Sequence, residues 1–240
     1  MGKFLPIKNG LTANQLKIIA IIAMTLDHFA WLFVSVISPI GQAMHIIGRL
    51  TSPIICFLLV EGYHHTKSFS NYLLRLGAFT IISAFAYTFF ISGKLFPIEN
   101  LSMIFTLLLG LISLKIYDSK LNSILKAIIL IGLIFLSTYG DWSIFGVLFI
   151  LAFHIGHYNK KLQIFNFAVV GFSWGLSAVI SAIINNEIWY FNLFQFAVLL
   201  SIPFLMLYNG KKGTKNHFGK WFFYIYYPLH LIIIKLIKLM

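Results

Sequence analysis

The chain has 240 residues, of which 60% are hydrophobic and only 10% are charged. An average soluble domain carries about 25% charged residues and about 45–50% apolar ones. A water-soluble fold of this length could not bury so much apolar surface, so the composition excludes a soluble enzyme, a disordered tail and a secreted disulfide scaffold. Lipid is therefore the expected solvent for most of the chain.

The net charge of +12 comes from 18 Lys and Arg against 6 Asp and Glu. These basic residues lie in short loops between apolar runs, a pattern typical of membrane topology rather than of a phosphate-binding face. No nucleic-acid partner is therefore expected. The single cysteine, Cys56, lies within an apolar run and allows no intrachain disulfide.

Nine apolar runs are predicted to be membrane-spanning helices, each of which needs about 20 mainly apolar residues. The fifth and sixth are short and are separated only by residues 139–141, so eight or ten spans are alternatives. The predicted fold is an all-α, polytopic transmembrane helix bundle that forms a single integral-membrane domain over residues 1–240. The nine predicted spans are 16–38, 43–63, 69–91, 99–117, 121–138, 142–158, 163–184, 188–208 and 218–238.

The loops between these runs are alternately basic, which predicts the orientation of the chain. By the positive-inside rule, the N-terminus is cytoplasmic, nine spans follow, and the protein lies in the cell membrane as a multi-pass protein. Lys235 and Lys238 lie toward the opposite end and are expected to snorkel to the outer surface. The basic loops are 64–67, 115–126, 160–161 and 211–220, and the N-terminal segment adds Lys3, Lys8 and Lys17.

Asp27 and His28 lie about twelve residues inside the first predicted span. That position is about 16–18 Å deep, near the middle of the bilayer. Ionisable groups at this depth are costly to insert and usually mark a functional site. A carboxylate beside a histidine is suited to general-base chemistry, although a hydrogen bond between packed helices is the alternative.

The second and last predicted spans add ionisable groups to this picture. Arg49 is expected to pair with Asp27, which would lower the cost of burying both charges. Pro53 is expected to kink the second span, and Glu61 lies near its cytoplasmic end. His230 has a depth similar to that of His28, so the two histidines predict one polar centre within the bundle.

A second group of basic residues lies at the predicted cytoplasmic rim. His64, His65 and Lys67 could contact phosphates or could simply be solvated. His154 and His157 lie three residues apart at a rim, and no metal site is expected from this spacing. The 211–220 loop either fixes topology or binds an anionic head group or nucleotide phosphates.

Several stretches of the chain resemble the TraX family, which is named for pilin acetylation. Lys17 and His28 are also separated by ten residues, the spacing of a basic residue and a histidine in the first helix of type-three membrane acyltransferases, to which this chain is similar. The stretches that carry the resemblance are 16–28, 47–53, 57–66, 72–76 and 226–230.

The resemblance implies that acetyl-CoA is the cytoplasmic acyl donor and that an acceptor is acetylated at or across the membrane. It implies that His28 is the catalytic base and that Lys17, where Arg is common in the family, meets the CoA phosphates. Direct transfer is favoured, with an acyl-histidine intermediate as the alternative. The acceptor is left open among a peptide or pilin N-terminus, a surface glycan and a lipid head group.

The other polar residues would complete this predicted acyltransferase site. Asp27 or Glu61 would orient a histidine, Arg49 would stabilise the oxyanion, and His230 would be a second base or an orienting partner. His64, His65 and Lys67 would add to the donor-binding end.

Two other functions fit the same sequence. A proton-coupled transporter or flippase would use the buried ionisable groups for coupling, but it predicts related halves, and none is evident. A non-catalytic membrane partner of an assembly system predicts that the polar centre is dispensable.

Overall fold

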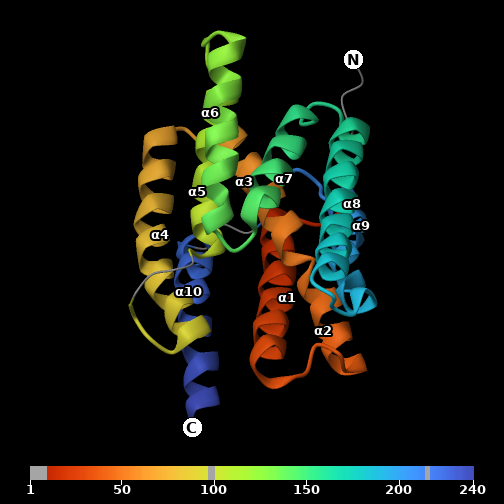
Figure 1. The fold of residues 1–240 in the computed structure, drawn as a ribbon. Coiled ribbons are helices and arrows are strands. Elements are labelled where there is room, and N and C mark those ends of the chain that lie inside the picture. The colour runs from red at the N-terminus through yellow and green to blue at the C-terminus, as the bar shows by residue number, and fades with distance from the viewer. Residues whose placement is uncertain (1–9, 97–100, 214–216) are drawn as a thin grey trace. The chain divides into compact units, whose positions relative to one another are not determined.

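The computed structural model describes residues 10–96, 101–213 and 217–240, with the side chains of 217–221 left aside. The described residues are helical apart from turns, loops and two isolated β-bridges, Leu11 with Tyr208 and Leu101 with Gly140. Figure 1 shows the helices in chain order. The predicted all-α fold class is confirmed for the part of the chain that the structure describes.

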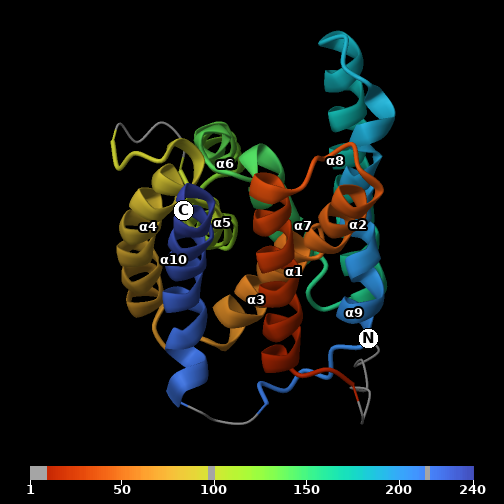
Figure 2. The same ribbon diagram turned by 90° about the horizontal axis from the view of Figure 1, so that it is seen from below.

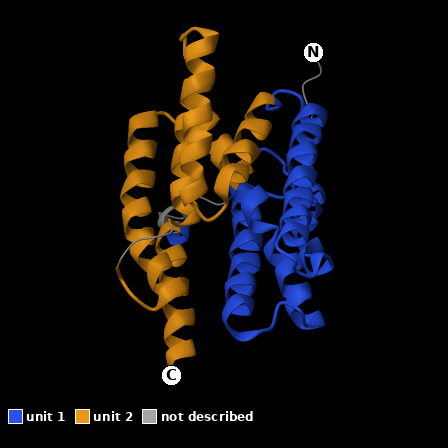
Figure 3. Ribbon diagram, in the orientation of Figure 1, with its two compact units in different colours: residues 1–55, 156–223 blue, residues 56–155, 224–240 orange. Residues whose placement is uncertain are grey.

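The chain divides into two compact units, each built from segments that are distant in sequence (Figure 3). Unit 1 comprises residues 1–55 and 156–223, and unit 2 comprises residues 56–155 and 224–240. Helix α3 (Thr51–His65) begins in unit 1 and continues into unit 2. Unit 1 otherwise holds α1 (Ala13–Phe33), α2 (Pro39–Gly48), α8 (Lys160–Ile184), the 3₁₀ helix η2 (Trp189–Ser201), α9 (Ile202–Met206) and the first turns of α10 (His217–Leu239). Unit 2 holds α4 (Phe69–Ser92), α5 (Met103–Tyr117), α6 (Ser123–Leu136), the short 3₁₀ helix η1 (Ser137–Tyr139), α7 (Ser143–Ile155) and the rest of α10.

Within the described residues, six helical segments are long and apolar enough to cross a membrane. Three shorter apolar helices lie between the third and the fourth of them, where the sequence also predicts spans. Residues 99 and 100 of the predicted fourth span lie outside the described residues. The six long segments are Ala13–Phe33, Pro39–His65, Phe69–Ser92, Lys160–Ile184, Trp189–Met206 and Phe222–Leu239, and the shorter ones are Met103–Tyr117, Ser123–Tyr139 and Ser143–Ile155.

In unit 1, α1 packs against α2, and η2 packs against both α2 and α8. Helix α1 begins with a capping box, in which the Thr12 side chain accepts from the Gln15 backbone and the Gln15 side chain accepts from the Thr12 backbone. η2 extends over 13 residues, which is long for a 3₁₀ helix. At about 2.0 Å per residue, this winding gives the segment greater reach than an α-helix of the same length.

The predicted span 43–63 is interrupted, because α2 ends at Gly48 and α3 begins at Thr51. The expectation of one kinked helix at Pro53 is corrected to two helices separated by Arg49 and Leu50. The reason is the proline, which has no N–H to donate to the Arg49 carbonyl four residues earlier and whose ring crowds that carbonyl. Pro53 itself lies in the first turn of α3, where a missing N–H is tolerated.

In unit 2, α5 is the central helix and packs against α4, α6 and α7. Ile104, Leu111 and Leu114 of α5 are fully buried, and Gly110 lets the Ile150 side chain of α7 approach its backbone. Helix α10 lies beside α4, where the Tyr224 and Phe79 rings stack with centroids 4.6 Å apart (Figure 2). The core of this unit is mainly apolar, and it also holds buried polar side chains such as Thr80 and Ser83 of α4.

Candidate functional site

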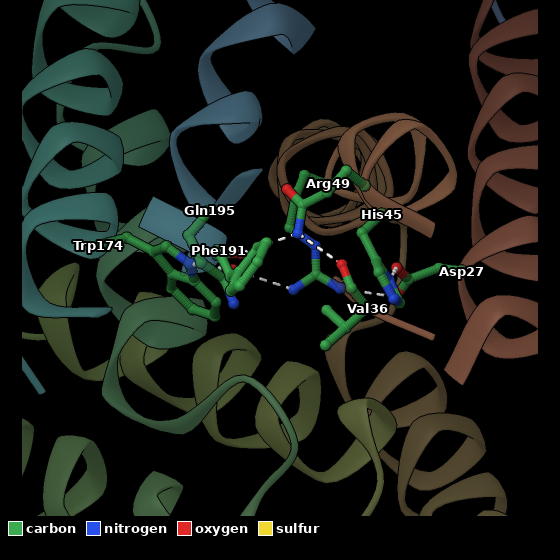
Figure 4. Close-up of polar contacts among 8 residues, drawn as sticks. Asp27, Val36, His45, Arg49, Trp174, Phe191 and Gln195 are labelled. Atoms are coloured by element: carbon green, nitrogen blue, oxygen red, sulfur yellow. Dashed lines mark hydrogen bonds and ion pairs between the residues drawn. The ribbon is translucent and has the colours of Figure 1, made fainter. Parts of the chain in front are cut away.

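The side chains of Asp27, His45 and Arg49 in unit 1 meet at the Asp27 carboxylate (Figure 4). His45 Nδ1 lies 2.8 Å from Asp27 Oδ1, and Arg49 Nη2 lies 2.6 Å from Asp27 Oδ2. Asp27 comes from α1, whereas His45 and Arg49 lie one helical turn apart at the end of α2. The predicted pairing of Asp27 with Arg49 is confirmed, and His45 is a partner that the sequence analysis missed.

The contact with Asp27 fixes the tautomer of His45. A carboxylate only accepts hydrogen bonds, so the hydrogen lies on Nδ1, and Nε2 of the neutral ring is an acceptor. The His45 side chain is fully buried, and its Nε2 has no hydrogen-bond partner among the described residues. Trp31 and Phe194 flank the ring with centroids 4.5 and 5.2 Å away. The site thus holds a buried, oriented imidazole with one nitrogen available as a base.

Arg49 links the carboxylate to the η2 segment. Its Nη1 donates to Gln195 Oε1 at 3.2 Å, and Trp174 Nε1 of α8 donates to the same oxygen at 2.8 Å. The guanidinium also lies over the Phe194 ring, with Cζ 5.4 Å from the centroid. Its Nε is buried and has no hydrogen-bond partner among the described residues. Arg49 therefore retains N–H groups that could stabilise an anion.

The close approach of α1 and α2 depends on Gly48. A β-carbon at this position would overlap the Asp27 side chain. Helix α2 is also hydrogen-bonded to η2, because Gln42 Nε2 donates to the Phe191 carbonyl at 3.0 Å. The same nitrogen donates to the Val36 carbonyl at 2.7 Å. The buried charges are balanced, since one carboxylate meets one guanidinium, and this balance is what makes ionised groups tolerable in an apolar bundle.

His28 follows Asp27 on α1 and is buried, as the sequence predicts for a site residue. Lys17 lies near the beginning of the same helix and interacts electrostatically with Lys212. The loop that carries Lys212 is tied to α1, because Ala13 N and Asn14 N donate to the carbonyls of Lys211 and Lys212 at 2.9 and 3.2 Å. Two ammonium groups are therefore gathered at the beginning of α1. Residues 214–216 of the predicted basic loop lie outside the described residues.

The remaining predicted site residues belong to unit 2, and their grouping with Asp27 stays a prediction. His230 is buried on α10, where its ring stacks on Tyr226 and its Nδ1 lies 3.0 Å from the Tyr226 carbonyl. His65 Nδ1 lies 2.8 Å from the Glu61 carbonyl, and Lys67 is exposed. His64 contacts His154, a relationship that sequence spacing did not predict.

No group of three or more His, Cys, Asp or Glu side chains within the described ranges is arranged to hold a metal ion.

Comparison with known proteins places this geometry in a family. The family described as "TraX protein" matches residues 12–238, which include every residue of the Asp27 site. The chain belongs to the TraX family. The match confirms the resemblance that the first and last spans indicate.

A similar protein from Dichelobacter nodosus is named "Probable fimbrial assembly protein FimC, serogroup H1". The two sequences are 35% identical over 234 residues, which cover 93% of this chain and 94% of the relative. No solved structure matches the chain.

Proposed function

We propose that this TraX-family protein is a membrane-embedded acetyltransferase. It would move an acetyl group from cytoplasmic acetyl-CoA to an acceptor at or across the membrane. The observation that carries the proposal is the buried Asp27–His45–Arg49 centre. It joins an oriented imidazole to a guanidinium with unused N–H groups inside an apolar unit.

The proposed chemistry is direct acyl transfer. The acceptor N–H or O–H attacks the thioester carbonyl, the new C–N or C–O bond forms, and the C–S bond breaks to release the CoA thiolate. A histidine takes the acceptor proton and passes it to that thiolate, so the CoA thiol leaves. The resemblance assigns this base to His28, which follows Asp27 on α1, and the Asp27 carboxylate also orients His45. An N–H of Arg49 would stabilise the negative charge on the carbonyl oxygen.

The donor would approach along α1 from its N-terminal end. The N–H groups of Ala13 and Asn14 are already bonded to loop carbonyls, so they do not serve as a helix N-terminal phosphate site. Donor phosphates would instead meet the ammonium groups of Lys17 and Lys212. His28 lies eleven residues beyond Lys17, about 16 Å along the helix. That separation suits a long thioester donor with its phosphates at one end and its acyl group at the other.

The proposed topology follows from the loops. All nine apolar helical segments would cross or enter the bilayer, with the N-terminus on the cytoplasmic side of the cell membrane. His64, His65 and Lys67 would then lie on the donor side. Glu61 and His230 would add an orienting group and a second base to the reaction centre. The acceptor would be a peptide or pilin N-terminus, a surface glycan or a lipid head group.

A second candidate function is a non-catalytic membrane partner in fimbrial assembly. The relative from Dichelobacter nodosus is named as a probable fimbrial assembly protein, and this name favours the alternative. It predicts that replacing the buried ionisable groups leaves assembly intact as long as the protein folds and inserts.

The test is acetyl transfer by the purified protein in detergent. Labelled acetyl-CoA is added together with a cell-envelope extract, and mass spectrometry identifies any molecule that gains the acetyl mass. The proposal expects a labelled product from wild type, and none from a His28→Ala variant that elutes as folded protein. Lys120→Ala, which changes an exposed lysine outside the proposed site, is the control and should transfer normally. Full transfer by His28→Ala removes the role given to His28, and the absence of any acetylated product with wild type overturns the proposed activity.

A further inference from the structure

Unit 2 contains a hydrogen-bonded chain of ionisable side chains that is separate from the Asp27 centre. His154 Nε2 lies 2.9 Å from Asp118 Oδ1, and His154 Nδ1 lies 3.1 Å from His64 Nε2. The Tyr63 hydroxyl donates to the other carboxylate oxygen of Asp118 at 2.8 Å. His64 is 90 residues from His154 in sequence, so this hydrogen-bonded chain of side chains forms only through the tertiary fold.

The hydrogen-bond partners determine where the hydrogens lie. The carboxylate accepts, so His154 carries its hydrogen on Nε2, and its Nδ1 is therefore an acceptor. His64 must then donate from Nε2, which leaves Nδ1 as the basic nitrogen of its ring. Both hydrogen bonds therefore donate in the same direction, from His64 to His154 and from His154 to the Asp118 carboxylate.

Helix C-termini and the Asp118 carboxylate stabilise a positive charge on this hydrogen-bonded chain, whereas burial of the His154 side chain opposes it. His64 and His154 lie in the last turns of α3 and α7, and Asp118 directly follows α5. The C-terminal ends of helices carry partial negative charge and stabilise a nearby imidazolium. The His154 side chain is only 5% exposed, whereas that of Asp118 is 42% exposed. The chain therefore runs from an exposed carboxylate through a buried histidine to a half-buried one.

The other titratable and charged groups around the chain come from each neighbouring helix. Tyr63 and Tyr117 present ring edges to His154, with centroids 5.7 and 5.4 Å away. The remaining groups are His65 and Glu61 on α3, Lys115 over the Phe69 ring, and Lys126, which donates to the Tyr117 carbonyl. The Asp118 carboxylate lies within hydrogen-bonding distance of the His154 ring.

We propose that Asp118, His154 and His64 form a second acid–base site, which binds one proton and passes it between the half-buried His64 and the exposed Asp118. This site does not depend on acetyl transfer, and its ligand is a proton exchanged with water or with a protic group at the helix ends.

The proton balance is simple. A proton added to His64 Nδ1 makes an imidazolium, which passes its Nε2 hydrogen to His154 Nδ1. His154 then carries both hydrogens and forms an ion pair with the Asp118 carboxylate. While the proton is held, the site has gained one proton and one positive charge. Transfer of the His154 Nε2 hydrogen to Asp118 Oδ1, and from there to water, completes the passage: an N–H bond breaks as an O–H bond forms, and the positive charge leaves with the proton.

The same geometry makes protonation of both rings together unfavourable. If they were, Nε2 of His64 and Nδ1 of His154 would both carry hydrogens across 3.1 Å, and the hydrogen bond would be lost. The two rings are also stacked with centroids 5.0 Å apart, so two positive charges would repel. The pair should therefore take up its first and second protons in two steps, separated by at least about one pH unit.

The test is ¹⁵N NMR of the full-length protein in lipid nanodiscs with labelled histidine, in which His64→Gln and His154→Gln assign the signals. The proposal expects the hydrogen on Nε2 of both rings at high pH, and a single proton taken up by the pair before a separate second step. A hydrogen on Nδ1 of either ring at high pH, or two overlapping and independent titrations, overturns it.

Two variants separate the relay from ordinary exposed histidines. Asp118→Asn removes the charge that holds the imidazolium, so the first step should need at least about tenfold more acid. If Asp118→Asn does not fold, His154→Gln should convert His64 to a single-step titration. His65→Gln, which changes the neighbouring exposed histidine, should keep two separate steps. An unchanged first step in Asp118→Asn, or a two-step His64 titration in His154→Gln, contradicts the proposal.

Discussion

Gly48 lies against the side chain of Asp27, so closely that a β-carbon at position 48 would overlap the Asp27 carboxylate. The contact joins the end of α2 to the middle of α1 at the level of the buried charges. The small residue is therefore part of the site, because it sets the distance at which His45 and Arg49 meet the carboxylate.

Gly48→Ala is predicted to displace Asp27 and to lower stability by about 1–3 kcal/mol, the usual penalty for overpacking. The measurement is thermal unfolding in detergent. Gly132→Ala is the matched control, because it is also a helical glycine and nothing lies within 4 Å of its added methyl group. It should be neutral or slightly stabilising. Equal stabilities of the two variants would contradict the close contact.

Asp27 and Arg49 are predicted to be energetically coupled. Removing one partner of a buried ion pair leaves the other charge uncompensated and typically costs about 3–5 kcal/mol. Asp27→Asn and Arg49→Gln should each be strongly destabilising, and the double variant should lose much less than the sum. A double-mutant cycle of unfolding measures this coupling, which should exceed about 0.5 kcal/mol. Additive losses would show that the two side chains do not interact.

Part of this site could be predicted from sequence, because a lone carboxylate and a lone arginine deep in apolar runs have few partners other than each other. The break at Arg49 also follows from Pro53 four residues later. His45 was missed, although its position four residues before Arg49 places both side chains on one helix face. Gln195, which accepts from both Arg49 and Trp174, could not be predicted, because it meets Arg49 only through tertiary packing across 146 residues of sequence.

Lys17→Ala is predicted to raise the KM for acetyl-CoA while kcat changes little. A charge-assisted contact to a phosphate is worth about 1.5–3 kcal/mol, so KM should rise about tenfold or more. Steady-state acetyl-transfer kinetics provide the measurement, and Lys120→Ala, which changes an exposed lysine, is the control. An unchanged KM would exclude Lys17 from the donor site.

The stability of unit 2 is predicted to depend on pH through Asp118. Burial raises the pKa of this carboxyl, but hydrogen bonds from His154 and Tyr63 outweigh it and hold the pKa below its ordinary value of 3.8. The folded state therefore binds this proton less readily than the unfolded state. Its contribution to stability is complete above the ordinary pKa and is lost as the pH falls through the lowered one.

Acid unfolding of wild type and Asp118→Asn measures this effect. The stability advantage of wild type should be present at about pH 5 and should shrink below about pH 4. Lys120→Ala should run parallel to wild type throughout. An advantage that does not change down to about pH 2 would contradict a role for the ionised carboxylate.

The hydrogen-bonded chain of His64, His154 and Asp118 in unit 2 could not be predicted from the sequence. His64, Asp118 and His154 each lie at the end of an apolar run, and each by itself is an ordinary rim residue. Their partnership requires the ends of α3, α5 and α7 to lie together, which hydrophobic periodicity does not specify. The 3₁₀ winding of η2 was also beyond prediction, since its composition is that of any apolar span.

The most direct test of the proposed function is acetyl transfer by Asp27→Asn, compared with wild type and Gly132→Ala in the same detergent. The buried centre predicts that Asp27→Asn loses at least about a hundredfold in rate, because neither His45 nor Arg49 keeps its charged partner. Gly132→Ala should match wild type, and circular dichroism should show that all three proteins are folded. Wild-type rates of acetyl transfer by a folded Asp27→Asn protein would contradict a catalytic role for this centre.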